Sequence, residues 1–81
     1  MSIRSEILHQ FEQVSQEQDM RLVPLSDELP LMDSGLDSLS FAIIVSRLET
    51  LLGVDPFSRN EDAPFPVNLR EFIHFYENAV Q

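Results

Sequence analysis

Asp33-Ser34-Gly35-Leu36-Asp37-Ser38-Leu39 is the stretch that decides the fold, because a long loop ends there and an apolar helix begins. Aspartate and serine are both residue types that are preferred at helix N-termini. Apolar residues then recur every three to four positions, which predicts a helix over residues 38–52 that stops at Gly53. Its expected core stripe is Phe41, Val45, Leu48 and Leu52, and the residues expected to widen it are Leu39, Ala42, Ile43, Ile44 and Leu51.

Ser38 opens this predicted helix, and a serine in that position has particular chemistry. The backbone N–H groups of a first helical turn lack intrahelical acceptors, and the positive end of the macrodipole lies there. The helix N-terminus therefore tolerates an anionic group esterified to the Ser38 hydroxyl. Its interaction with that anion is favourable by about 0.3–1 kcal/mol at an exposed site. Gly35 allows a turn at positive φ. Asp37 can cap the helix or face a basic partner, and Leu39 offers apolar contact beside the serine.

Two further amphipathic helices are predicted on either side of this one. The first covers residues 2–18, with Ser2 as its N-cap. The last opens at Asn68, and Glu71 three residues later completes a capping-box-like pair. The residues expected to be buried are Ile3, Ile7, Leu8, Phe11 and Val14 in the first helix and Leu69, Phe72, Ile73, Tyr76 and Val80 in the last, whereas Phe75 is expected at the surface.

The connections between these helices are irregular. Residues 19–37 are punctuated by two prolines and a glycine, yet they are too rich in leucine for a floppy linker, so the leucines are expected to join the core. Residues 54–67 hold three prolines and allow at most one helical turn, near residues 58–62. With no strand signal, the sequence predicts a single all-α domain over residues 1–81, an irregular three- to four-helix bundle.

Composition excludes several classes of function. The 81 residues carry a formal net charge of −9, and the five basic residues are scattered arginines, so binding to nucleic acid or to an anionic membrane is not expected. Basic protein partners are expected instead. The absence of cysteine excludes disulfides and thiolate metal sites, and suits a reducing cytoplasm. No secretory signal and no apolar stretch of membrane-spanning length is recognisable.

The string Gly35-Leu36-Asp37-Ser38-Leu39 resembles the phosphopantetheine attachment motif of acyl and peptidyl carrier proteins. The resemblance extends over nearly the whole chain, through the chain length and the order of helices and loop. It implies that Ser38 receives phosphopantetheine from coenzyme A through a separate Mg²⁺-dependent phosphopantetheinyl transferase, which reads Asp37 and Leu39. It also implies a monomeric, acyl-carrier-protein-like bundle that carries cargo as a thioester and catalyses nothing itself.

Two departures from the family pattern bear on the cargo. Fatty-acid carriers have a strongly acidic second helix, whereas residues 38–52 carry only Glu49 and Arg47 as charges. The region of the usual short third helix is rich in proline, with Phe57 and Phe65. These departures favour a specialised free-standing carrier, loaded by an adenylating ligase and unloaded by an acceptor transferase or synthase. An aminoacyl cargo is slightly favoured over another acyl group.

Three other interpretations compete with the carrier. A non-modified acidic helical adaptor would use Ser38 only as a helix cap. A serine hydrolase would need a base beside Ser38, but His9 and His74 fall on the flanking helices, so no enzyme is expected. Asp33 and Asp37 lack the spacing of an EF-hand loop, so no metal site is expected.

Overall fold

The computed structural model describes residues 2–59 and 65–80. These residues form a short 3₁₀ turn and four α-helices, which in chain order are α1 (Ile3–Glu17), the 3₁₀ turn η1 (Leu31–Asp33), α2 (Ser38–Leu52), α3 (Pro56–Arg59) and α4 (Leu69–Val80). Within the described residues there is no strand, only an isolated antiparallel bridge between Pro30 and Asn68. The predicted all-α, three- to four-helix bundle is confirmed.

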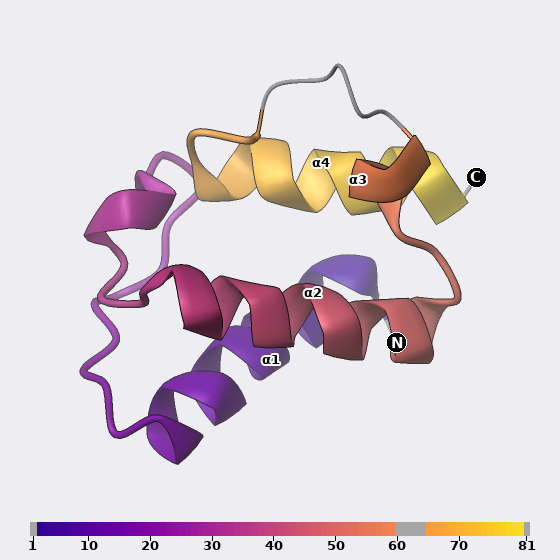
Figure 1. Cartoon of the computed structure of the whole chain (residues 1–81). Coiled ribbons are helices and arrows are strands. Elements are labelled where there is room, and N and C mark those ends of the chain that lie inside the picture. Colours follow the sequence, from indigo (N-terminus) through magenta and orange to yellow (C-terminus); the bar gives the residue numbers. More distant parts are fainter. Residues whose placement is uncertain (1, 60–64, 81) are drawn as a thin grey trace.

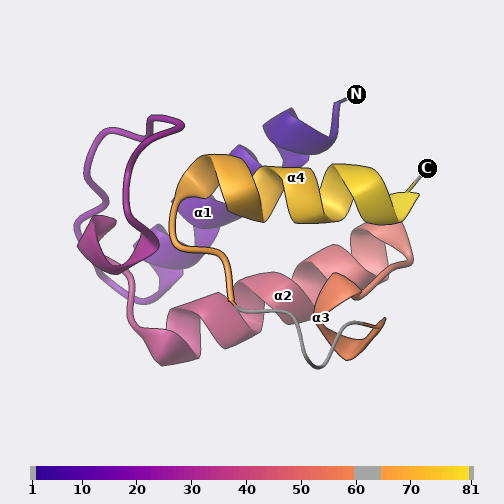
Figure 2. The ribbon, with the colours of Figure 1, turned by 90° about the horizontal axis from the view of Figure 1, so that it is seen from above.

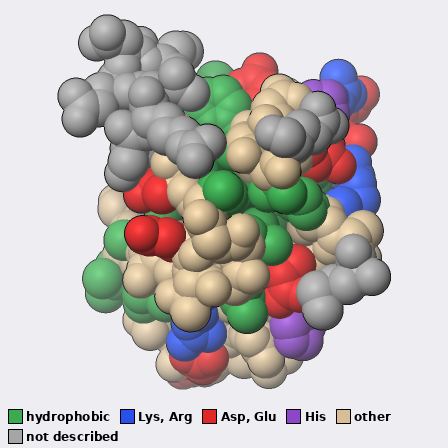
Figure 3. All heavy atoms as spheres, turned by 90° about the vertical axis from the view of Figure 1, so that its right-hand side faces the viewer, with side chains coloured by type: hydrophobic (Ala, Val, Ile, Leu, Met, Phe, Trp, Pro, Cys, Tyr) green, Lys and Arg blue, Asp and Glu red, His purple; other side chains and the backbone are tan. Residues whose placement is uncertain are grey.

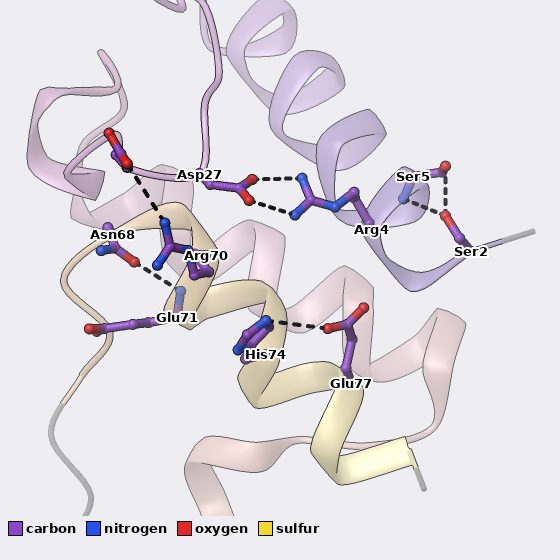
Figure 4. Close-up of polar contacts among 10 residues, drawn as sticks. Ser2, Arg4, Ser5, Asp27, Asn68, Arg70, Glu71, His74 and Glu77 are labelled. Atoms are coloured by element: carbon purple, nitrogen blue, oxygen red, sulfur yellow. Dashed lines mark hydrogen bonds and ion pairs between the residues drawn. The ribbon is translucent and has the colours of Figure 1, made fainter.

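Local side-chain caps explain where the outer helices begin. The Ser5 N–H donates to Ser2 Oγ at 3.0 Å, which confirms Ser2 as the N-cap of α1. At α4 the Glu71 N–H donates to Asn68 Oδ1 at 2.9 Å. The Glu71 carboxylate in turn accepts from the Val67 N–H at 3.0 Å, one residue earlier than a standard capping box. Figure 4 shows the contact between Asn68 and Glu71. Both predicted helix starts are therefore correct.

The helices pack as two layers that meet in one core (Figures 1 and 2). α1 contacts both α2 and α4, and the short α3 packs on α4. The long connection before α2 closes one end of the bundle, while α3 and both chain ends lie toward the other end (Figure 1). The fully buried side chains at the centre come from all three long helices and are Ile7, Phe11, Val14, Ile44, Leu48, Leu69, Phe72, Ile73 and Tyr76.

Several burial predictions need correction. Ile3 and Leu8 of α1 are only partly buried. The face of α2 that is fully buried is centred on Ile44 and Leu48, whereas Phe41, Val45 and Leu52 are only partly buried. Three residues expected to widen the stripe are exposed, namely Leu39, Ala42 and Leu51. Val80 is 45% exposed, because it lies on the last turn of α4, at the end of the bundle. Phe75 is half-buried instead of exposed, since the ring of Phe57 packs beside it with centroids 5.6 Å apart.

The long loop is held against the core largely as predicted. Leu31 and Leu36 are buried, and Leu22 and Leu25 pack against the core from its edge. Met32, an apolar residue of the same loop that is not a leucine, is 92% exposed. The difference arises because η1 turns Leu31 inward, which leaves its neighbour facing solvent.

The proline-rich region forms a helical turn earlier than predicted. α3 begins at Pro56, a residue whose fixed φ and missing N–H suit a first helical position. The Phe57 N–H donates to Asp55 Oδ1 at 3.0 Å at the same turn. The predicted end of this turn, residues 60–62, lies outside the described residues. In the described part of the chain, no helix is long and apolar enough to cross a bilayer.

Candidate functional site

The turn that delivers the chain to α2 depends on Gly35. Its φ is +99°, a conformation that side-chain-bearing residues rarely adopt. A Cβ atom at this position would also lie 2.2 Å from the backbone oxygen of Arg21. The sequence therefore predicted the positive φ correctly, and the tertiary structure adds a second reason for glycine, the close approach of the incoming loop.

A buried serine stabilises the same turn, a role that no pattern in the sequence predicts. Ser34 is fully buried, and its hydroxyl donates to the Leu31 carbonyl at 2.6 Å. The same oxygen accepts from the Leu36 N–H at 3.4 Å. The Ser34 carbonyl accepts from the Val23 N–H at 3.1 Å, so both arms of the loop are tied together just before α2.

Asp37 is the N-cap of α2. Its Oδ1 accepts from the Ser40 N–H at 2.8 Å, and its carbonyl accepts from the Phe41 N–H at 3.1 Å. The hydrogen bond from the Ser40 backbone is the main reason why the pKa of the Asp37 carboxyl lies below its usual range. Asp37 is thus ionised at neutral pH and stabilises the first turn.

Ser38 is the first residue of α2, and its side chain is exposed. Among the described residues, its hydroxyl has no hydrogen-bond partner. Leu39, the next residue, is 61% exposed beside the serine. The arrangement leaves an oxygen nucleophile in solvent at the positive end of a 15-residue helix, where an added phosphate charge is tolerated.

A groove of about 770 Å³ opens beside this hydroxyl. Its lining consists of Pro30, Leu31, Met32, Leu36, Asp37, Ser38, Phe41, Ala42, Phe65, Pro66 and Val67. The rings of Phe41 and Phe65 meet edge to face, with centroids 6.5 Å apart. Phe41 contacts core Phe11 in the same way at 5.7 Å. The groove was not predicted, because its two sides come from segments about 30 residues apart in the chain.

Backbone pairing fixes one side of the groove. The Leu31 N–H donates to the Val67 carbonyl at 2.9 Å, and the Leu69 N–H donates to the Leu29 carbonyl at 3.0 Å. The Arg70 N–H donates to the Asp27 carbonyl, also at 3.0 Å. These bonds supply acceptors for the first N–H groups of α4 and hold residues 65–67 against the long loop.

The charges of the molecule are distributed around this site and not concentrated in it. On the outward side of α2 the exposed residues are Leu39, Ala42, Ser46, Thr50 and Leu51, with Glu49 as the exposed carboxylate. Arg47 forms a two-point ion pair with Glu17 of α1. Acidic side chains are spread over the end of the molecule that bears α3 (Figure 3). The prediction that this helix presents a nearly neutral face is confirmed.

The remaining polar groups lie away from the site. His9 and His74 are both exposed, and His74 lies 3.9 Å from Glu77 on α4 (Figure 4). Arg4 of α1 binds Asp27 of the long loop at two points, with distances of 2.8 and 3.1 Å. Within the described ranges, no group of three or more His, Asp or Glu side chains is placed to hold a metal ion.

Comparison with known proteins agrees with this geometry. The family model for the phosphopantetheine attachment site matches residues 5–60, which is more than half of the chain and includes the turn, Asp37 and Ser38. Among curated proteins and among solved structures, the comparisons found no significant match. Domains of this family carry covalently attached phosphopantetheine and are non-catalytic carriers. The chain therefore belongs to the phosphopantetheine-binding carrier family and is not an enzyme.

Proposed function

We propose that Ser38 is the residue that carries the phosphopantetheine arm. The observation that carries the proposal is the exposed Ser38 hydroxyl at the start of α2, on the rim of an apolar groove. Gly35 supplies the turn that presents it, and Asp37 fixes the first helical turn behind it. Asp37 and Leu39, both exposed beside the serine, are the side chains that the modifying enzyme would read.

In the modification reaction this chain supplies only the nucleophile and its position. In the modification, the Ser38 oxygen forms a bond to the phosphorus that bears pantetheine, and the bond to the adenosine bisphosphate part of coenzyme A breaks. The hydroxyl proton leaves to a base that the separate Mg²⁺-dependent transferase supplies, since neither histidine lies at the site. The chain contributes position and charge: an open hydroxyl, and a helix N-terminus that favours the new phosphodiester anion.

The cargo is an aminoacyl or other acyl group held as a thioester on that arm. A separate adenylating ligase loads it and an acceptor transferase or synthase removes it. The nearly uncharged outer face of α2 supports partners that differ from those of a strongly acidic carrier. The monomeric state and the cytoplasmic location stay predictions from the sequence, as does the single domain over residues 1–81.

An intact-mass measurement tests the proposal. The purified chain is incubated with coenzyme A, Mg²⁺ and a permissive phosphopantetheinyl transferase. We expect one phosphopantetheine adduct in the wild type and none in Ser38→Ala. Ser46→Ala is the matched control, because Ser46 is an exposed serine on the same helix, and it should be modified like the wild type.

The non-modified adaptor is the second candidate, and the same experiment separates it from the carrier. An unchanged mass for well-folded wild-type protein would contradict attachment at Ser38 and favour the adaptor, in which Ser38 is only the first residue of a helix. An adduct that persists in Ser38→Ala would place the arm on another residue.

A further inference from the structure

We infer that a cleft between α1 and α2 binds the unloaded phosphopantetheine arm, by a hydrogen bond between an amide group of the arm and the side-chain amide of Gln10. The inference rests on the proposed attachment of the arm to Ser38 and adds the place where that arm lies. The cleft has a volume of about 330 Å³, and its lining comes from α1 and α2, which lie side by side (Figure 1). It is separate from the groove, because the two share no lining residue.

Gln10 is the residue that marks this cleft as a binding site. It lines the cleft but is only 5% exposed, so its side chain lies at the floor. Its Oε1 atom is buried and accepts no hydrogen bond from any described residue. A buried carbonyl oxygen without a donor is unfavourable, and a leucine of similar size would avoid that cost. The unpaired oxygen therefore points to a hydrogen-bond donor that enters the cleft from outside.

The Gln10 amide can present its oxygen to such a donor. The last torsion of a glutamine side chain is broad and roughly two-fold, so a half-turn exchanges the positions of the oxygen and the nitrogen. An N–H group in the cleft can then donate to Gln10 Oε1. Gln13, one turn later on α1, is exposed in the same cleft and supplies N–H donors for a carbonyl group. The two glutamines together match a secondary amide, and the pantetheine arm contains two such amides.

The arm is long enough to reach the cleft from Ser38. Thr50 lines the cleft and follows Ser38 by twelve residues on α2, which is about 18 Å along the helix axis. About fourteen bonds separate the serine oxygen from the thiol of the arm, and roughly 1.2 Å per bond in an extended chain gives roughly 17 Å. The amide next to the thiol then falls near the level of Arg47, which also lines the cleft.

The polarity of the two hollows assigns the amide groups to the cleft. Apart from Asp37 and Ser38, all residues that line the groove are apolar. An amide N–H that left water for such a lining would lose its hydrogen bond, which is unfavourable. The cleft offers amide and hydroxyl groups, and its one charged residue, Arg47, is neutralised by the ion pair with Glu17.

Attachment at Ser38 makes this binding an intramolecular step. A short flexible tether gives an effective concentration in the millimolar range. A few weak contacts are then enough to populate the bound state. Leu51 is 52% exposed at the cleft and offers an apolar contact to the methylene groups of the arm.

NMR of the unloaded carrier tests the inference. Spectra of the ¹⁵N-labelled chain are recorded before and after modification with coenzyme A, and intact mass confirms the modification. We expect shifts of the Gln10 side-chain amide and the Thr50 backbone amide, in addition to those around Ser38. Nuclear Overhauser contacts should join the methylene groups of the arm to the Gln10 side chain.

Gln10→Leu removes the hydrogen bond. One net hydrogen bond corresponds to roughly a fivefold change in an equilibrium constant, so the shift at Thr50 on modification should fall about fivefold. The matched control Gln16→Leu changes an exposed glutamine of α1 that does not line the cleft, and it should keep the full shift. Urea unfolding should find Gln10→Leu at least as stable as the wild type, because it removes a buried unpaired oxygen.

Thr50→Phe is a second and independent variant. It fills the cleft from an exposed position on α2 and leaves the core unchanged. It should remove the shift of the Gln10 side-chain amide and the Nuclear Overhauser contacts with the arm.

The outcomes separate the arm site from the attachment. A confirmed mass increase with shifts confined to the first turn of α2, or with shifts that both Gln10→Leu and Thr50→Phe leave unchanged, would overturn the arm site alone. A Gln10→Leu chain clearly less stable than the wild type would mean that the glutamine serves the fold, which would also overturn it. Absence of any mass increase would overturn the proposed function, and this inference with it.

Discussion

Single residues in this chain act mainly through the backbone conformations that they permit. The two glycines both have positive φ, +99° at Gly35 and +76° at Gly53, but their surroundings differ. A Cβ at Gly53 would meet no atom within 4 Å, whereas a Cβ at Gly35 would collide with the Arg21 carbonyl. Gly53 only ends α2, whereas Gly35 also lets two loop segments approach each other at the site.

Alanine substitutions should separate these two roles. Gly53→Ala should lower the free energy of unfolding by about 1–2 kcal/mol, the usual cost of a left-handed conformation for a residue with a side chain. Gly35→Ala should cost clearly more, because the collision adds to the strained φ. Urea unfolding followed by circular dichroism measures both, and equal losses in the two variants would contradict the role of the Arg21 contact.

At the scale of elements, the long loop behaves as part of the folded structure although it contains no regular element beyond one 3₁₀ turn. It is tied to the start of α4 by three backbone hydrogen bonds, and the Arg4–Asp27 pair ties it to α1 (Figure 4). This pairing gives the groove its fixed wall and gives α4 its missing acceptors.

Amide hydrogen exchange should report this pairing. The Leu31 and Leu69 amides donate across the two segments and should exchange about tenfold more slowly, or slower still, than the Leu22 amide of the same loop. Leu22 is half-buried but has no backbone acceptor among the described residues, which makes it a matched reference. Similar exchange at all three amides in native-state NMR would mean that the loop is not paired in solution.

The whole molecule carries a formal net charge of −9, and ion pairs between elements offset part of the self-repulsion. The pKa of Asp27 is lowered chiefly by its hydrogen bonds from Arg4, and the pKa of Glu17 chiefly by those from Arg47. Both ion pairs are exposed, so each contributes only modestly to the free energy of unfolding. One pair joins α1 to the long loop and the other joins α1 to α2.

These lowered pKa values predict the direction of the pH dependence. In the unfolded chain the carboxyl pKa is about 3.9 for Asp and 4.3 for Glu, and in the folded protein both pKa values are lower. The stability that these two carboxylates contribute is therefore fully present when the pH is above the unfolded pKa values. As pH falls below about 4, the unfolded state binds more protons than the folded state, so the free energy of unfolding decreases. Urea titrations between pH 6 and pH 3 should show this loss, and either Glu17→Gln or Arg47→Gln should make it shallower. A pH-independent stability in that interval would contradict the ion-pair assignments.

The sequence by itself determined the elements and the candidate serine, because these depend on local chemistry. Apolar spacing predicted the long helices to within a residue or two, and the caps at Ser2 and Asn68 and the turn at Gly35 followed from residue type. The Gly35-to-Leu39 string also pointed to the family that the comparison then showed.

Only the tertiary structure decided what surrounds that serine. The groove, the buried Ser34, the exposure of Met32 and the packing of Phe75 depend on which segments meet across the bundle. Residues 27–31 and 65–70 are far apart in the chain, and neither carries a pattern that names the other as its partner. Such contacts are set by the collective packing of the core, whereas helix starts and turns are set within a few residues of the backbone that they shape.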